Sequence, residues 1–150
     1  MRLCDFLPEQ AIDLQIAGPG RDDILAQLIH LLATGPADAA VLQRLLLHRE
    51  SLGSTGVGYG IGIPHCRTPL VDRLRLAYGR HLAGVPFDAV DGQPVHHFFL
   101  IVAPPVEVSN TYLPMLGRIA QLVKEPDVPP RLMTLTQPAE LLALFDEKGF

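Results

Sequence analysis

The segment from residue 94 to residue 103, PVHHFFLIVA, is apolar at every position from Phe98 to Ala103. A strand with one face in water alternates apolar and polar side chains, but this run has no polar residue to turn toward solvent. It therefore predicts a central strand that is covered on both faces. Residues 11–16 (AIDLQI) and 74–82 (LRLAYGRHL) predict two further strands.

Helical patterns lie on both sides of these strands in the chain. Residues 21–35 and 36–51 carry apolar side chains at helical spacing. Ser109 or Asn110 can cap a third helix, and a last helix begins near Pro138. This order of elements predicts an α/β fold, in which a mixed parallel and antiparallel sheet is flanked by helices on both faces.

The composition of the chain limits which classes of protein it can belong to. Its 150 residues, 48% hydrophobic and 19% charged, predict a single globular domain over residues 1–150. The net charge of −4 provides no basic surface for nucleic acid. No apolar run is long enough to span a membrane and the first residues do not resemble a signal peptide, so we expect a cytoplasmic protein. Cys4 and Cys66 are expected to be free thiols.

A glycine occupies every second position from Gly56 to Gly62, in a run that ends on a histidine, GVGYGIGIPHC. The run lacks the glycine spacing of a dinucleotide-binding loop and the Gly-Lys-Ser/Thr ending of a phosphate loop, so a nucleotide site is not favoured. Two interpretations stay open. If the run forms one continuous strand, the face that carries only glycines could pack tightly against the chain's own backbone. Alternatively, it could admit a partner protein close to His65.

The residues near this histidine suit phosphoryl chemistry. A neutral imidazole has a lone pair that can attack phosphorus, so His65 is a candidate nucleophile. Arg49 offers a bidentate fork for phosphoryl oxygens, and the hydroxyls of Ser54 and Thr55 offer further donors. No cofactor is required for such a transfer.

A metal site is a weaker candidate. The other histidines are His30, His48, His81, His96 and His97. None stands in an HxH or HxxxH pattern or beside a suitably spaced carboxylate, which does not favour zinc. A metal-dependent hydrolase therefore stays open only as a less favoured function than phosphoryl transfer or partner binding.

The stretch RESLGSTGVGYGIGIPH resembles the signature around the phosphorylated histidine of the phosphotransferase-system IIA component, fructose–mannitol class. The resemblance extends through GVPFDAVDGQPVHHFFLIVAP and the flanking helices. It implies a phosphocarrier in which His65 accepts phosphate from a small histidine phosphocarrier protein, and Arg49, Ser54 and Thr55 line the site. The match is closer to the regulatory branch, which is linked to nitrogen control. Further partners would be regulatory target proteins or a membrane sugar permease component.

Two positions depart from the family pattern. Tyr112 stands where the family has a second histidine, and Cys66 stands where glycine is usual. A phenol donates a hydrogen bond but is neutral at pH 7, so we expect Tyr112 to contact the phosphate or His65 without adding charge. Changing Tyr112 to histidine should then alter the phosphorylation rate. Two alternatives follow: a regulatory binding module that has lost phosphotransfer, or a free-standing sugar-specific IIA component.

Overall fold

The computed structural model describes residues 2–106 and 110–150, and its centre is one mixed sheet. The strand order is β1-β5-β6-β3-β2, with β4 pairing with β6 beside β3. The strands are β1 (Ile12–Asp13), β2 (Gly56–Gly58), β3 (Ile61–Gly62), β4 (His65–Arg67), β5 (Arg75–Val85) and β6 (Val95–Ala103). Strand β6 runs antiparallel to β5 but parallel to β3 and β4, so the predicted mixed sheet is confirmed.

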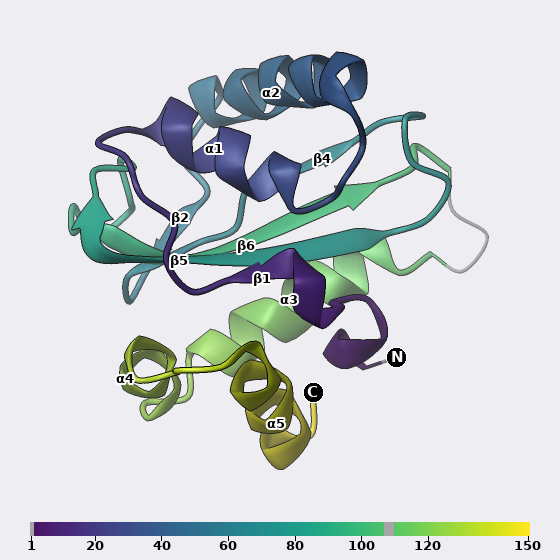
Figure 1. Ribbon diagram of the computed structural model, residues 1–150. Coiled ribbons are helices and arrows are strands. Elements are labelled where there is room, and N and C mark those ends of the chain that lie inside the picture. Colours follow the sequence, from purple (N-terminus) through teal and green to yellow (C-terminus); the bar gives the residue numbers. More distant parts are fainter. Residues whose placement is uncertain (1, 107–109) are drawn as a thin grey trace.

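Helices cover both faces of the sheet, as predicted. Helices α1 and α2 lie on one face, whereas α3, α4 and α5 lie on the other (Figure 1). Their bounds are α1 (Arg21–His30), α2 (Pro36–Ser51), α3 (Tyr112–Val123), α4 (Val128–Met133) and α5 (Pro138–Lys148), and two short 3-10 helices, Leu3–Asp5 and Glu9–Ala11, precede β1. No helix in the described residues is long and apolar enough to cross a membrane.

Local sequence explains where two of these helices begin or end. Helix α2 starts with Pro36 at its first turn, where the missing N–H costs nothing. In α5, Gln137 and Glu140 form a capping box at the start, and Gly149 adopts the left-handed conformation that ends the helix. The predicted cap Ser109 lies outside the described residues, and the residue directly before α3 is Thr111 rather than Asn110.

The central strand has the character expected from its sequence. All six residues from Phe98 to Ala103 are at most 1% exposed, so both faces of β6 lie in the core. The first strand was predicted over residues 11–16, but β1 contains only Ile12 and Asp13. Directly before β1, residues Glu9–Ala11 form a 3-10 turn. Directly after it, the Gln15 N–H donates to the Asp13 carboxylate in a local turn. The residues next to β1 on both sides are therefore held in turns and do not extend its pairing with β5.

The glycine run is not a single strand. It folds into a tight hairpin, in which β2 and β3 pair antiparallel with Gly56 opposite Gly62. The two residues at the turn, Tyr59 and Gly60, have φ values of 59° and 74°. Positive φ at both positions is the geometry of a two-residue hairpin turn that follows the twist of the strands. The continuous alternation expected from the sequence is therefore wrong, because the chain reverses in the middle of the run.

Candidate functional site

His65 stands at the start of β4, which continues the line of β3 along β6. Strand β3 pairs with β6 at Phe98, and β4 pairs three residues farther along, with His65 opposite Ile101. Pro64 lies between the two strands, and its carbonyl accepts the Ile101 N–H at 3.0 Å. The backbone that carries His65 is therefore held firmly against the central strand.

The ring of His65 has a defined orientation. Its Nδ1 lies 2.7 Å from the carbonyl oxygen of Ile63. Since a carbonyl oxygen can only accept, Nδ1 carries the hydrogen and donates it. In the neutral ring Nε2 then keeps the lone pair, which makes Nε2 the nucleophilic atom.

The surroundings of His65 favour this neutral ring. Burial lowers the pKa of His65 below its ordinary value of 6.5, and the charge of Arg49 lowers it further. The bond to the Ile63 carbonyl and the charge of Glu50 act in the opposite direction, but burial is the largest effect. The imidazole is therefore unprotonated, and able to attack an electrophile, at neutral pH.

Arg49 reaches the site from the last turn of α2. Its Nη1 donates to the carbonyl of Gly53 at 2.7 Å, which holds the side chain across the end of the helix. One bond occupies only part of the guanidinium, which has five N–H donors. Arg49 lies close enough to His65 for its charge to lower the pKa of the imidazole, so the structure brings these two predicted residues together.

Glu50 was not anticipated as part of this region. Its carboxylate is only 4% exposed, and it accepts the Thr55 backbone N–H at 2.9 Å together with the Thr55 hydroxyl. The Ser54 hydroxyl donates to the carbonyl of Phe87. The single hydrogens of both hydroxyls are therefore committed to the protein, and Ser54 and Thr55 shape the loop that leads into β2. A glutamate directly after Arg49, five residues before Thr55, was the available signal.

Tyr112 is the first residue of α3, and it lies beside His65 as expected. The two ring centroids are 6.1 Å apart, within the range of an aromatic pair. The guanidinium of Arg67 covers the Tyr112 ring, with its Cζ 4.3 Å from the centroid. Arg67 was missed, although the second residue after His65 on one strand projects from the same face.

The glycines of the run contact the chain itself. A Cβ on Gly56 would lie 2.8 Å from Cα of Ala89, and a Cβ on Gly62 would lie 3.3 Å from the Phe98 ring. The Val90 N–H also donates to the carbonyl of Gly56. For these positions, tight packing on the chain's own backbone and core is the correct interpretation, and a bare face open to a partner is wrong.

Three of the other histidines form hydrogen bonds within the protein. His96 Nδ1 lies 3.1 Å from the carbonyls of His81 and Leu82, and His81 Nε2 lies 2.9 Å from the carbonyl of Gly18. His97 Nδ1 bonds to the buried Tyr78 hydroxyl at 2.9 Å. Burial lowers the pKa of His97 to about 3 and keeps its ring neutral.

The other two histidines, His30 and His48, are exposed on α1 and α2. Within residues 2–106 and 110–150, no three His, Cys, Asp or Glu side chains are close enough together to hold a metal ion.

Cys66 is half-buried on the strand position between His65 and Arg67, and burial raises the pKa of its thiol to about 11.

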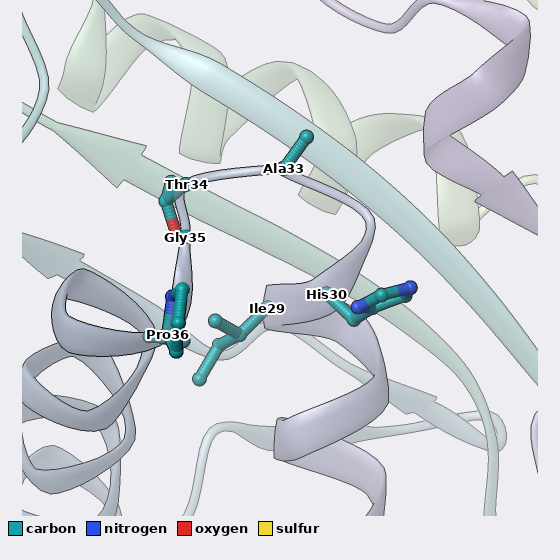
Figure 2. A pocket seen from close by; sticks show the side chains of 7 residues that line it. Ile29, His30, Ala33, Thr34, Gly35 and Pro36 are labelled. Carbon is teal, nitrogen blue, oxygen red and sulfur yellow. The ribbon is translucent and has the colours of Figure 1, made fainter.

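A separate pocket of about 410 Å³ lies at the turn between α1 and α2. Ile29, His30, Thr34 and Pro36 are among the residues that surround it (Figure 2). Its lining includes neither His65 nor Arg49, so the pocket is distinct from the candidate site.

Comparison with known proteins identifies the family. Residues 5–148 match the family described as "Phosphoenolpyruvate-dependent sugar phosphotransferase system, EIIA 2". A nitrogen regulatory protein of Bradyrhizobium diazoefficiens is 34% identical over 134 residues, covering 88% of this chain and 86% of the relative. The fructose-specific EIIABC component of Bacillus subtilis is 32% identical over 135 residues, but the match spans only 21% of that longer protein.

Solved structures agree with this assignment. The nitrogen regulatory protein IIA-Ntr from Neisseria meningitidis superposes with a TM-score of 0.86 at 29% identity, covering 94% of this chain and 97% of that one. The mannitol IIA of Escherichia coli, at 19% identity and a TM-score of 0.75, shares the fold. The chain therefore belongs to the EIIA 2 family of the phosphotransferase system, in the branch of the nitrogen regulatory IIA proteins.

Proposed function

We propose that this chain is a phosphocarrier whose His65 accepts a phosphoryl group on Nε2 from a histidine phosphocarrier protein. The observation that carries the proposal is the bond from His65 Nδ1 to the Ile63 carbonyl, which leaves the Nε2 lone pair available. The lowered pKa of His65 supports it, because only the neutral ring is a nucleophile.

The transfer exchanges one nitrogen–phosphorus bond for another. The Nε2 lone pair forms a bond to phosphorus while the corresponding bond in the donor phosphohistidine breaks, and that electron pair returns to the donor imidazole. The His65 ring keeps the Nδ1 hydrogen and becomes positively charged. The hydrogen bond to the Ile63 carbonyl then strengthens, because its donor is now cationic.

Arg49 supplies positive charge to the oxygens of the transferred group. Phosphoryl transfer depends mainly on positioning and on charges aimed at those oxygens. The last turn of α2 and the Gly53 carbonyl hold the Arg49 side chain, and its charge already acts on the His65 ring. In this proposal Ser54 and Thr55 act indirectly, by holding the loop that surrounds the two residues.

The role we assign is regulatory and related to nitrogen metabolism, in the cytoplasm. The name of the Bradyrhizobium relative, which is 34% identical to this chain over 134 residues, supports this role over a sugar-specific one. Partners would be the histidine phosphocarrier protein and regulatory targets, and a membrane sugar permease component is the alternative recipient. A solved complex of mannitol IIA with phosphorylated IIB from Escherichia coli is a structural neighbour at 19% identity.

Intact mass after incubation with phosphoenolpyruvate and the two general phosphotransferase proteins tests the proposal. We expect a gain of one acid-labile phosphoryl group, absent in His65→Ala and retained in His48→Ala, which removes an exposed histidine of α2. If the donor proteins phosphorylate a competent IIA but not this chain, the chain is a binding module without phosphotransfer.

A further inference from the structure

The charge near His65 has a second source besides Arg49. Strand β4 carries His65 and Arg67 two positions apart, opposite Ile101 and Ala103 of β6. Side chains two positions apart on a strand project from the same face, and their Cα atoms are about 6.6 Å apart. His65 and Arg67 therefore leave the sheet on the same side.

Tyr112 contacts both of these side chains. Its ring lies 6.1 Å from the His65 ring, and the Arg67 Cζ lies 4.3 Å from the Tyr112 centroid. The second distance is well within the roughly 6 Å limit for a cation over an aromatic face. Tyr112 is only 8% exposed, so its ring is a fixed surface on which the guanidinium rests.

The guanidinium also has donors to spare. Its Nη1 donates to the Pro105 carbonyl at 3.3 Å, a weak bond that fixes the end of the side chain. No carboxylate in the described part of the chain forms an ion pair with Arg67. Its charge is therefore not cancelled by any residue that the structure describes, and the side chain is exposed on the face that His65 presents.

We propose that Arg67, positioned by the Tyr112 ring, supplies the second positive charge that stabilises the phosphoryl group on His65. This inference rests on the proposed phosphorylation of His65. Tyr112 is a positioning residue here, and Arg67 takes over the electrostatic part that a cationic side chain at position 112 would have. The neutral Tyr112 alone would suggest that the site lacks this charge, but Arg67 supplies it.

The test is the rate of single-turnover transfer from the phosphorylated donor, measured at several donor concentrations. Arg67→Gln should lower the maximal rate about tenfold, which is less than the 10²–10³-fold typical of a buried oxyanion donor because Arg67 is exposed. Lys124→Gln is the matched control. It removes one exposed charge at the far end of α3, about 18 Å from Tyr112 by helix geometry, and should leave the rate unchanged.

Rescue distinguishes the supply of charge from a merely structural effect. Arg67→Lys should restore part of the rate, because charge remains while the planar stack on Tyr112 is lost. Tyr112→His alone should have less than a twofold effect, contrary to the rate change expected from the sequence, because Arg67 already supplies the charge. In the Arg67→Gln variant, which lacks that charge, Tyr112→His should raise the rate severalfold. The equilibrium of transfer should also shift toward the donor in Arg67→Gln, because the phosphorylated product loses a stabilising charge.

Failure of this inference and failure of the proposed function give different results. A phosphorylated chain whose rate and equilibrium are unchanged by Arg67→Gln overturns the role of Arg67 alone. A defect that neither Arg67→Lys nor Tyr112→His relieves also overturns it. If the unaltered chain gains no phosphoryl group, the proposed function fails, and this inference fails with it.

Discussion

The buried carboxylate of Glu50 provides the sharpest test of how the site is built. It accepts two bonds from Thr55, one from the backbone N–H at 2.9 Å and one from the hydroxyl, and it ties the end of α2 to the start of β2. Replacing Glu50 with alanine removes both bonds and leaves the Thr55 N–H unpaired in a residue that is only 4% exposed. Glutamine keeps the shape and can still pair with both groups, but without the charge.

The expected costs follow from these contacts. Bonds to a charged group contribute about 1.5–3 kcal/mol each and neutral bonds about 1 kcal/mol, with non-additivity between neighbours. We therefore expect Glu50→Ala to lower the free energy of unfolding by about 3 kcal/mol and Glu50→Gln by about 1 kcal/mol. In a chain of this size, about 3 kcal/mol corresponds to a fall in Tm of about 6–12 °C.

Urea denaturation monitored by circular dichroism measures these differences, and hydrogen exchange at the Thr55 amide reports the local effect. Glu9→Ala, at an exposed glutamate in the second 3-10 helix, is the control and should stay within about 0.5 kcal/mol of the unaltered protein. Equal stability of Glu50→Ala and Glu50→Gln, or unchanged Thr55 exchange in Glu50→Ala, would show that this bond pair does not hold the loop.

Three further predictions concern titration, packing and reactivity. Burial and Arg49 lower the pKa of His65, so its NMR titration midpoint should lie below 6.5 and rise in Arg49→Gln; an unmoved midpoint would contradict the proximity of that charge. Gly56→Ala should lower the free energy of unfolding by about 1–3 kcal/mol, because the added Cβ would meet the backbone of Ala89. Gly117→Ala, on α3 with open space around it, should leave this free energy unchanged or raise it, as measured by urea denaturation. Cys66, whose burial raises the pKa of its thiol to about 11, should react with iodoacetamide at pH 8 much more slowly than a free cysteine, and an equal rate would argue against that environment.

The long apolar patterns were sufficient to predict the core of the fold. Residues 36–51 match α2 to the residue, and the covered strand was identified because Phe98 to Ala103 leave no polar side chain for solvent. Helix α4 was missed because it has only six residues and begins with Val128 and two consecutive prolines, a pair that is more typical of a loop than of a helix. Strand β4 was missed because three residues after a proline carry too little periodicity to be recognised.

The candidate site was predicted in part. Arg49 and Tyr112 both lie near His65, as expected, but Glu50 and Arg67 were not anticipated, although each stands close in the sequence to a residue that was. Glu50 acts through a bond across a loop, and Arg67 acts through a contact between β4 and α3. Spacing along the chain places both residues near the site, but which groups their side chains contact depends on how the loop, β4 and α3 pack together.

The proposed phosphoryl transfer is tested most directly by identifying which ring nitrogen of His65 carries phosphorus. The protein would be labelled with ¹⁵N-histidine, phosphorylated by the donor system, and examined by ¹⁵N and ³¹P NMR at neutral pH. Because Nδ1 is held by the Ile63 carbonyl at 2.7 Å, we predict phosphorylation at Nε2 alone, with the Nδ1 hydrogen retained. Phosphorus on Nδ1, or on a histidine other than His65, would contradict the account.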